Sequence, residues 1–232
     1  MTVNILFKNK WVCGMTKLFL FDMDGTLLDT DRKLHNDMIE TYNLLNLPLI
    51  ESHNYENWIG NAEDKGVSRQ EFWEAFKEMR IGRTWYGSIK KGETTLHSDA
   101  LPTLEELTNI YGRENMGIMT KSSEEETQEK IEALPELLNY VDKDNIKSTG
   151  YDQELKPAKI SIAGDLISKI DNPEPIIIGD SLKEDIATAE ALKQEYPAVG
   201  ILLDRHGNHD QTKANHVIQN LNELINMYKQ KP

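Results

Sequence analysis

Short apolar runs that alternate with amphipathic segments limit what this chain can fold into. The apolar runs are Leu18–Phe21, Met116–Met119, Pro175–Ile178 and Val199–Leu203, and runs of this kind are typical of strands buried on both faces of a sheet. Helical patterns lie between and after them, at about residues 101–111, 123–134, 158–170, 184–195 and 217–228. Strands that alternate with helices predict an α/β fold with a doubly wound, Rossmann-like parallel sheet.

Residues 32–98 interrupt this alternation, since they contain amphipathic stretches without a convincing buried strand. We therefore predict a core formed by residues 15–31 and 99–232, with a helical cap inserted at 32–98. Three of the four tryptophans lie in the insertion, and we expect most of its aromatic residues to form its core: Trp58, Trp73 and Trp85. The functional alternative is a lid over the strand ends. Position and residue type alone make four cap residues candidates for substrate contact: Gly60, Arg69, Arg83 and Tyr86.

Composition argues against several classes of partner. A net charge of −13 disfavours binding to nucleic acid or to an anionic membrane, although a bound cation can still attract a small anion. No apolar run approaches the roughly 20 residues that a membrane helix needs. The single cysteine, Cys13, allows no internal disulfide and fits a reducing, cytoplasmic setting. Residues 1–14 do not resemble a signal peptide, and we treat them as an N-terminal tail or a misassigned start.

Two carboxylates follow the first apolar run, in Asp22-Met23-Asp24-Gly25-Thr26. A polar turn with Gly25 at positive φ is one interpretation. The chemical interpretation is that one acid binds a divalent cation and attacks phosphorus, while the other protonates the leaving group. Residues i and i+2 of an ideal strand share a face, so Asp22 and Asp24 can address one pocket. Gly25 would let the backbone approach an anionic group.

Further candidates follow the later strands. Thr120-Lys121-Ser122 comes after the second apolar run, where a hydroxyl and the amides that open the next helix can bind phosphate oxygens. Helix capping by Ser122 or Ser123 is the alternative. Lys156 stands just before Pro157 at a predicted helix start. It is either a surface lysine or a clamp that offsets charge on a phosphoryl group.

A last pair of acids follows the third apolar run, Asp180 at the strand end and Asp185 five residues on. Ser181 with Glu184 fits a capping box, and Asp185 fits the helix dipole. Asp180 is harder to explain by capping, and with Asp22 it offers oxygen ligands of the kind that Mg²⁺ prefers. Because carboxyl ends of parallel strands share an edge, we expect the residues that end these strands to meet there: Asp22, Thr120 and Asp180.

In this order and spacing, the motifs resemble those of haloacid dehalogenase superfamily phosphatases of the phosphoglycolate phosphatase or β-phosphoglucomutase type, which carry a helical cap. The matching residues are Asp22-Met23-Asp24-Gly25-Thr26, Thr120, Lys156-Pro157 and Gly179-Asp180-x4-Asp185. The resemblance implies that Asp22 is a nucleophile that forms an aspartyl-phosphate, and that Asp24 is the general acid/base. It also implies a phosphate site and a Mg²⁺ site. The phosphate site would comprise Gly25, Thr120, Lys121 (through its amide) and Lys156, and the Mg²⁺ site Asp22, Asp24 (through its carbonyl), Asp180 and Asp185, with Glu184 as a rival of Asp185.

The activity that the resemblance implies is Mg²⁺-dependent hydrolysis of a phosphate monoester on a small phosphorylated metabolite, such as phosphoglycolate or a sugar phosphate. Asp24 argues against dehalogenase and phosphonatase chemistry, because those relatives lack this acid. A phosphomutase shares all four motifs and stays open as the alternative. A non-catalytic phosphate- or metal-binding module is a third hypothesis, and the chain can act as a monomer or a dimer.

Overall fold

The computed structural model describes residues 14–52, 55–79, 87, 89, 92, 94–150, 158–207 and 213–229. The chain divides into two compact units, one formed by Met1–Leu28 with Leu96–Pro232 and the other by Asp29–Thr95. We describe each unit by itself. Within the described part of the chain, none of the helices has the length and apolar character that crossing a membrane requires.

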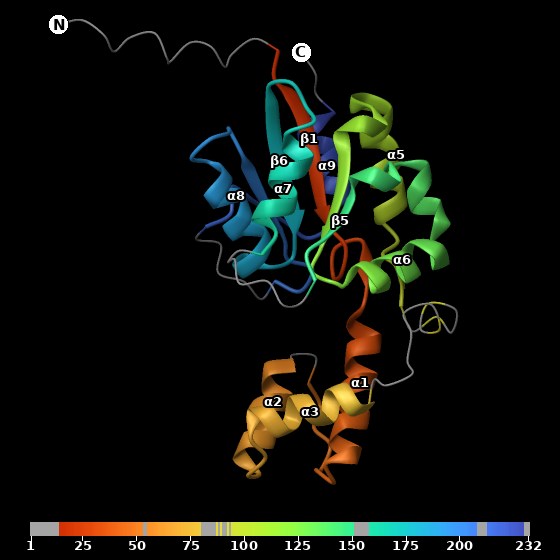
Figure 1. Ribbon diagram of the computed structural model, residues 1–232, viewed down its shortest axis with the longest axis vertical. Helices are drawn as coiled ribbons and strands as arrows, with labels where there is room; N and C mark the ends of the chain where they lie inside the picture. The colour runs from red at the N-terminus through yellow and green to blue at the C-terminus, as the bar shows by residue number, and fades with distance from the viewer. Residues whose placement is uncertain are drawn as a thin grey trace, which may run out of the picture. The chain divides into compact units, whose positions relative to one another are not determined.

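The first unit contains a six-stranded parallel sheet in the order β5-β4-β1-β6-β7-β8. Its strands are β1 (Thr16–Asp22), β4 (Met116–Thr120), β5 (Ile146–Ser148), β6 (Pro173–Gly179), β7 (Val199–Leu203) and β8 (His216–Ile218). Figure 1 shows β1 and β6 side by side at the centre, with helices on both sides of the sheet. β1 lies between β4 and β6, so the chain adds β4 and β5 on one side of β1 and then β6, β7 and β8 on the other. The predicted doubly wound α/β fold is therefore confirmed.

Helices and short turns connect these strands. The helices are α5 (Ala100–Tyr111), α6 (Glu124–Ala133), α7 (Ile160–Ile167), α8 (Ala187–Leu192) and α9 (Asn222–Tyr228). Three 3₁₀ turns also lie along the chain. One, η1 (Arg113–Asn115), precedes β4, and the other two lie between α6 and β5: η2 (Pro135–Asn139) and η3 (Lys143–Asn145). A π-helical turn, η4 (Leu182–Ile186), joins β6 to α8.

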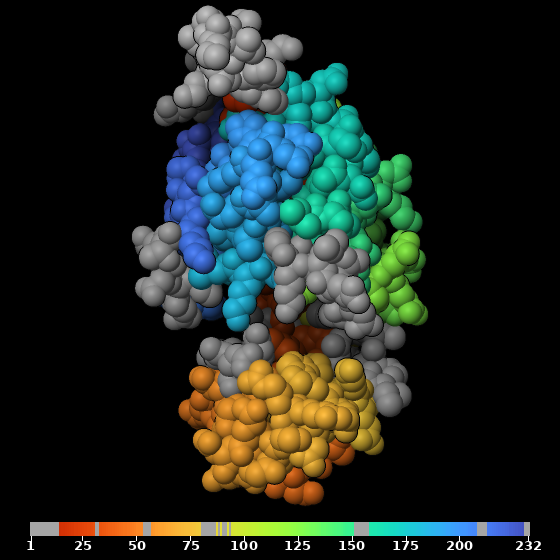
Figure 2. All heavy atoms as spheres, turned by 60° about the vertical axis from the view of Figure 1, so that its left-hand side comes forward, coloured from red at the N-terminus to blue at the C-terminus, as the bar shows by residue number. Residues whose placement is uncertain are grey.

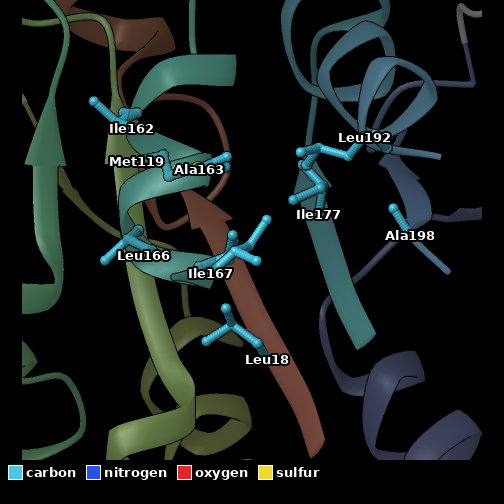
Figure 3. Close-up of a cluster of buried hydrophobic side chains, with 11 residues drawn as sticks. Leu18, Met119, Ile162, Ala163, Leu166, Ile167, Ile177, Leu192 and Ala198 are labelled. Carbon is cyan, nitrogen blue, oxygen red and sulfur yellow. The ribbon is translucent and has the colours of Figure 1, made fainter. Parts of the chain in front are cut away.

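Alternate residues of β1 pack against opposite helical layers, as the period of two in a strand requires. Leu18 and Leu20 belong to an apolar cluster with residues of α7 and α8, and Figure 3 shows Leu18 beneath Leu166 and Ile167 of α7. In the space-filling view, α7 and α8 lie side by side over this face (Figure 2). Phe19 points the other way, with its ring 5.0 Å from that of Tyr111 in α5. Burial on both faces explains why β1 is apolar throughout.

The structure differs from the sequence prediction at the edges of the sheet. The edge strands β5 and β8, each three residues long, were not predicted, because so short a run gives no usable hydrophobic period. The helix predicted from residue 217 begins only at Asn222, since residues 216–218 form β8. The helix predicted from 184 to 195 is instead the π-helical turn η4 followed by the short α8.

The second unit is helical, with α1 (Asp31–Leu44), α2 (Tyr55–Asp64) and α3 (Arg69–Met79). Trp58 is fully buried and makes an edge-on contact with Tyr42 at 4.7 Å between ring centroids. Trp73 packs against the same cluster, which confirms the predicted aromatic core for these two residues. Trp85, Arg83 and Tyr86 lie outside the described residues. The two-residue strands β2 (Leu28–Asp29) and β3 (Thr95–Leu96) pair where the chain passes between units.

Candidate active site at the carboxyl ends of the strands

Asp22 is the last residue of β1, and its side chain is buried among charged groups. The Lys159 ammonium donates hydrogen bonds to Oδ1 of Asp22 and to Oδ1 of Asp185, the latter at 2.7 Å. The Thr26 hydroxyl lies 3.5 Å from the other oxygen of Asp22. The strand therefore ends in a buried carboxylate that is held by a buried cation.

Lys159 is the residue directly before α7, and its side chain is only 3% exposed. The family resemblance implies the lysine role for Lys156, three residues earlier, which lies outside the described residues. Lys159 was missed because a lysine beside a helix start is most often solvated. The second lysine in Lys156-Pro157-Ala158-Lys159 was the available signal.

Three carboxylates gather at this edge of the sheet. Asp22, Asp180 and Asp185 each place an oxygen within 4.8 Å of the others. Asp185 is fully buried, and its Oδ2 accepts a hydrogen bond from the Ser181 amide at 3.0 Å. Asp180 follows β6 directly. The topology thus brings together acids that are more than 150 residues apart in the chain, at 22 and 180.

Two glycines make room for this cluster. Gly25 has a φ of +79°, which L side chains rarely adopt, and a Cβ there would overlap the Asp180 carboxylate. A Cβ at Gly179 would overlap the carboxyl group of Asp185 in the same way. At both positions, the absence of a Cβ therefore allows a carboxylate to lie directly against the backbone.

Burial and neighbouring charges shift the pKa values of the groups in this cluster. Burial raises the pKa of Asp22 well above its usual value, and Lys159 only partly opposes this. Burial, together with the neighbouring Asp185, raises the pKa of Asp180 to about 6. Burial alone would lower the pKa of Lys159, but Asp185 and Asp22 outweigh it and raise the pKa above its ordinary value. The cluster therefore has an excess of negative charge that a further cation would relieve.

Asp24 has a different set of partners. Its Oδ2 accepts hydrogen bonds from the hydroxyls of Thr120 at 3.3 Å and Ser122 at 3.1 Å. The Lys130 ammonium lies 2.8 Å from Oδ1 and 2.7 Å from Oδ2. The Asp24 side chain is 30% exposed, whereas that of Lys130 is completely buried. The two acids of the motif are thus held by two separate lysines.

Lys121 and Glu184, both considered at the sequence level, pair with each other. The Lys121 ammonium lies 2.8 Å from Oε1 of Glu184, and Oε2 accepts a hydrogen bond from the Ala158 amide at 3.0 Å. Burial alone would raise the pKa of Glu184, but these hydrogen bonds lower it below the ordinary value. Ser181 accepts a hydrogen bond from the Glu184 amide, yet the Glu184 side chain does not complete the predicted capping box. A complete capping box does form at the start of α6, between Ser123 and Glu126.

The donor set fits a hard divalent cation such as Mg²⁺. Asp22, Asp180 and Asp185 present carboxylate oxygens, which Mg²⁺ prefers as ligands. Among the described residues, these three carboxylates lie around a single ammonium, that of Lys159, which leaves negative charge in excess when they are ionised. Such a cation would neutralise the excess.

Comparison with known proteins agrees with this fold. Residues 19–199 match the family model described as haloacid dehalogenase-like hydrolase. No curated protein matches the chain at a significant level.

Solved structures share the fold at low sequence identity. A HAD phosphatase from Thermococcus onnurineus is 20% identical, with a TM-score of 0.61 over 91% of this chain and 97% of its own. YfnB from Bacillus subtilis, in a structure bound to magnesium, is 16% identical, with a TM-score of 0.60 over 94% and 100% of the two chains. A HAD family hydrolase from Deinococcus radiodurans, with bound phosphate and sodium, is 16% identical, with a TM-score of 0.61 over 92% and 96%.

Since the family model spans most of the chain, this protein belongs to the haloacid dehalogenase-like hydrolases and is an enzyme.

Proposed function

We propose that this protein is a Mg²⁺-dependent phosphatase that hydrolyses a small phosphate monoester through an aspartyl-phosphate on Asp22. The observation that carries the proposal is the separation of two acids within one motif. Asp22 lies in the carboxylate cluster beside Lys159, and Asp24 lies among hydroxyls beside Lys130. Different surroundings suit two carboxylates to different roles, one as a nucleophile and the other as an acid/base. The phosphatase and the phosphate-bound hydrolase among the structures of similar fold support the same chemistry.

In the first half of the reaction, an oxygen of Asp22 forms a bond to phosphorus and the ester P–O bond breaks. The leaving oxygen keeps the electron pair of that bond and takes a proton from Asp24. In the second half, water attacks phosphorus and gives a proton to Asp24. The bond between phosphorus and Asp22 then breaks, which releases phosphate and restores the carboxylate.

Positive charge is needed wherever an anionic carboxylate approaches an anionic phosphate. Lys159 contacts Asp22 directly and is placed to offset charge there. We propose that Lys156, Thr120 and the amides of Gly25 and Lys121 bind the phosphoryl oxygens. Mg²⁺, held by Asp22, Asp180, the carbonyl of Asp24 and Asp185 directly or through water, would add the remaining charge neutralisation.

We propose that residues 32–98 act as a cap that favours small substrates and excludes bulk water. Phosphoglycolate or a sugar phosphate is the substrate class that such a cap suits. We place the enzyme in the cytoplasm, which the single cysteine supports.

The test is phosphate release from a panel of small phosphate esters, measured with Mg²⁺ and with EDTA. The variants are Asp22→Asn and, as a matched control, Asp165→Asn, an exposed aspartate of α7. We expect Mg²⁺-dependent release by the wild type and the control and none by Asp22→Asn. Asp22→Asn with near wild-type activity would refute the proposal.

A further inference from the structure

We propose that Lys130 is a positioning residue for Asp24, one that holds the acid/base carboxylate in its working orientation. The inference rests on the proposed function, since it takes Asp24 to be the acid/base of phosphate-ester hydrolysis. No sequence pattern singles out Lys130, which lies in a strongly polar stretch, Glu124-Glu-Glu-Thr-Gln-Glu-Lys130.

The position of Lys130 follows from the start of α6. The capping box at Ser123 and Glu126 fixes where the helix begins, directly after β4. Side chains of a helix lean toward its N-terminus, and Lys130 is seven residues after Ser123. The aliphatic part of the Lys130 side chain therefore extends toward the N-terminus of α6, and its ammonium reaches the Ser122 hydroxyl just after β4.

The hydrogen bonds around Asp24 form one connected network. Lys130 donates to both oxygens of Asp24 and, at 2.7 Å, to the Ser122 hydroxyl. The Ser122 hydroxyl donates onward to Asp24. The Ser122 amide donates to the Thr120 hydroxyl at 3.1 Å, and that hydroxyl also donates to Asp24. Donors from β4, the following loop and α6 thus converge on one carboxylate and leave it little rotational freedom.

The burial of Lys130 distinguishes this contact from an ordinary surface ion pair. The lysine side chain is 0% exposed and Asp24 is 30% exposed, so the cation is inside and the acid faces outward. A buried lysine is rare and needs a partner. The Asp24 carboxylate thus stays partly accessible to solvent while its ammonium partner is completely buried.

The experiment compares two substrates that differ in their need for an acid. An alkyl phosphate has a leaving oxygen that must be protonated, whereas p-nitrophenyl phosphate releases a stable phenolate. The parameter kcat/KM covers the steps up to release of the alcohol or phenolate. It therefore reports the proton transfer from Asp24 separately from the later hydrolysis of the phosphoenzyme.

The variant is Lys130→Met, which keeps much of the side-chain volume and removes the charge. We expect kcat/KM for the alkyl ester to fall about 30-fold or more, and for p-nitrophenyl phosphate less than about 3-fold, because general acid catalysis contributes about 10²- to 10⁴-fold. The control is Lys17→Met, which removes a lysine paired with Glu174 near the start of β1 and should leave both values unchanged. If Lys130→Met does not fold, Lys130→Gln supports the same comparison.

A second comparison asks whether Lys130 acts through Asp24. In an Asp24→Asn background, Lys130→Met should produce no further loss of kcat/KM on the alkyl ester. An equal loss on both esters, or a full further loss in the Asp24→Asn background, would overturn the inference and leave the proposed function intact. A wild-type enzyme that hydrolyses neither ester would contradict the proposed function, and the role of Lys130 with it.

Discussion

The backbone of Gly25 lies directly against the carboxylate of Asp180, so that a Cβ at residue 25 would overlap Oδ2 of Asp180. The two residues come from different strand ends, one after β1 and the other after β6. Gly25 also has a φ of +79°. Both the conformation and the space at this position therefore require glycine.

Gly25→Ala should lower the free energy of unfolding by about 1 to 3 kcal/mol through backbone strain alone. It should also displace Asp180 and weaken Mg²⁺-dependent turnover at least about tenfold, since a misplacement on the order of 1 Å can reduce catalysis about 100-fold. The matched control is Gly66→Ala, because Gly66 has a φ of +88° with open space around it. Gly66→Ala should also lower the free energy of unfolding through backbone strain, but it should not reduce turnover. Equal activity in the two variants, measured per folded molecule, would contradict the proposed role of Gly25.

The metal-free protein should become less stable as the pH rises from about 4 to about 6. The pKa of Asp180 is about 6 in the folded protein, against an ordinary 3.8, so the folded state holds the proton more tightly. Stability is therefore highest below the unfolded pKa, declines through this window and stays lower above it. The loss from this group is on the order of 3 kcal/mol, since each pKa unit corresponds to about 1.4 kcal/mol. Thermal unfolding in EDTA across this pH range measures it. Asp180→Asn should remove much of the slope, and an unchanged slope in that variant would argue against the assignment.

Mg²⁺ should raise the melting temperature near neutral pH, because it binds the folded state and relieves the repulsion among the acids. At a concentration of about 100 times the Kd, the gain in stability is about 2.7 kcal/mol. Asp180→Asn should lose this response, whereas the exposed-residue control Asp165→Asn should retain it. A response to Mg²⁺ that survives in Asp180→Asn would place the cation elsewhere.

Lys159→Met should lower the free energy of unfolding in EDTA by about 3 to 5 kcal/mol, since it leaves buried charges without their partner. It should also reduce turnover by about 10²- to 10³-fold, because Lys159 contacts the nucleophile.

Lys156→Met tests the lysine that the sequence motif selected. We expect it to reduce turnover as a phosphate ligand without a comparable loss of stability. Lys159→Met with wild-type stability and turnover would show that its ion pairs have no role.

Much of the fold could be predicted from the sequence, because β1, β4, β6 and β7 are buried on both faces and therefore read as continuous apolar runs. The positions of Asp22 and Asp180 at strand ends followed from the same pattern. The edge strands β5 and β8 could not be predicted, since three residues carry no period.

The two buried lysines were missed for a different reason. Lys130 and Lys159 stand on or next to helices, where lysine is ordinarily solvated. Their roles depend on which acid each one meets, and that partner is 106 residues away for Lys130 and 137 for Lys159. Only the assembled sheet brings each pair together. Gly179 is a similar case, because its contact with Asp185 depends on the π-helical turn η4.

The most direct measurement is to trap the covalent intermediate on Asp22. The wild-type enzyme would be mixed with Mg²⁺ and acetyl phosphate or an ester that it hydrolyses, quenched in acid and treated with borohydride, which reduces an acyl phosphate to an alcohol. Mass spectrometry of the peptides would then locate the change. We predict that Asp22 becomes homoserine, that Asp24 does not, and that Asp22→Asn yields no product. Turnover of the ester without any modification of Asp22, or with modification of another residue, would contradict the proposed nucleophile.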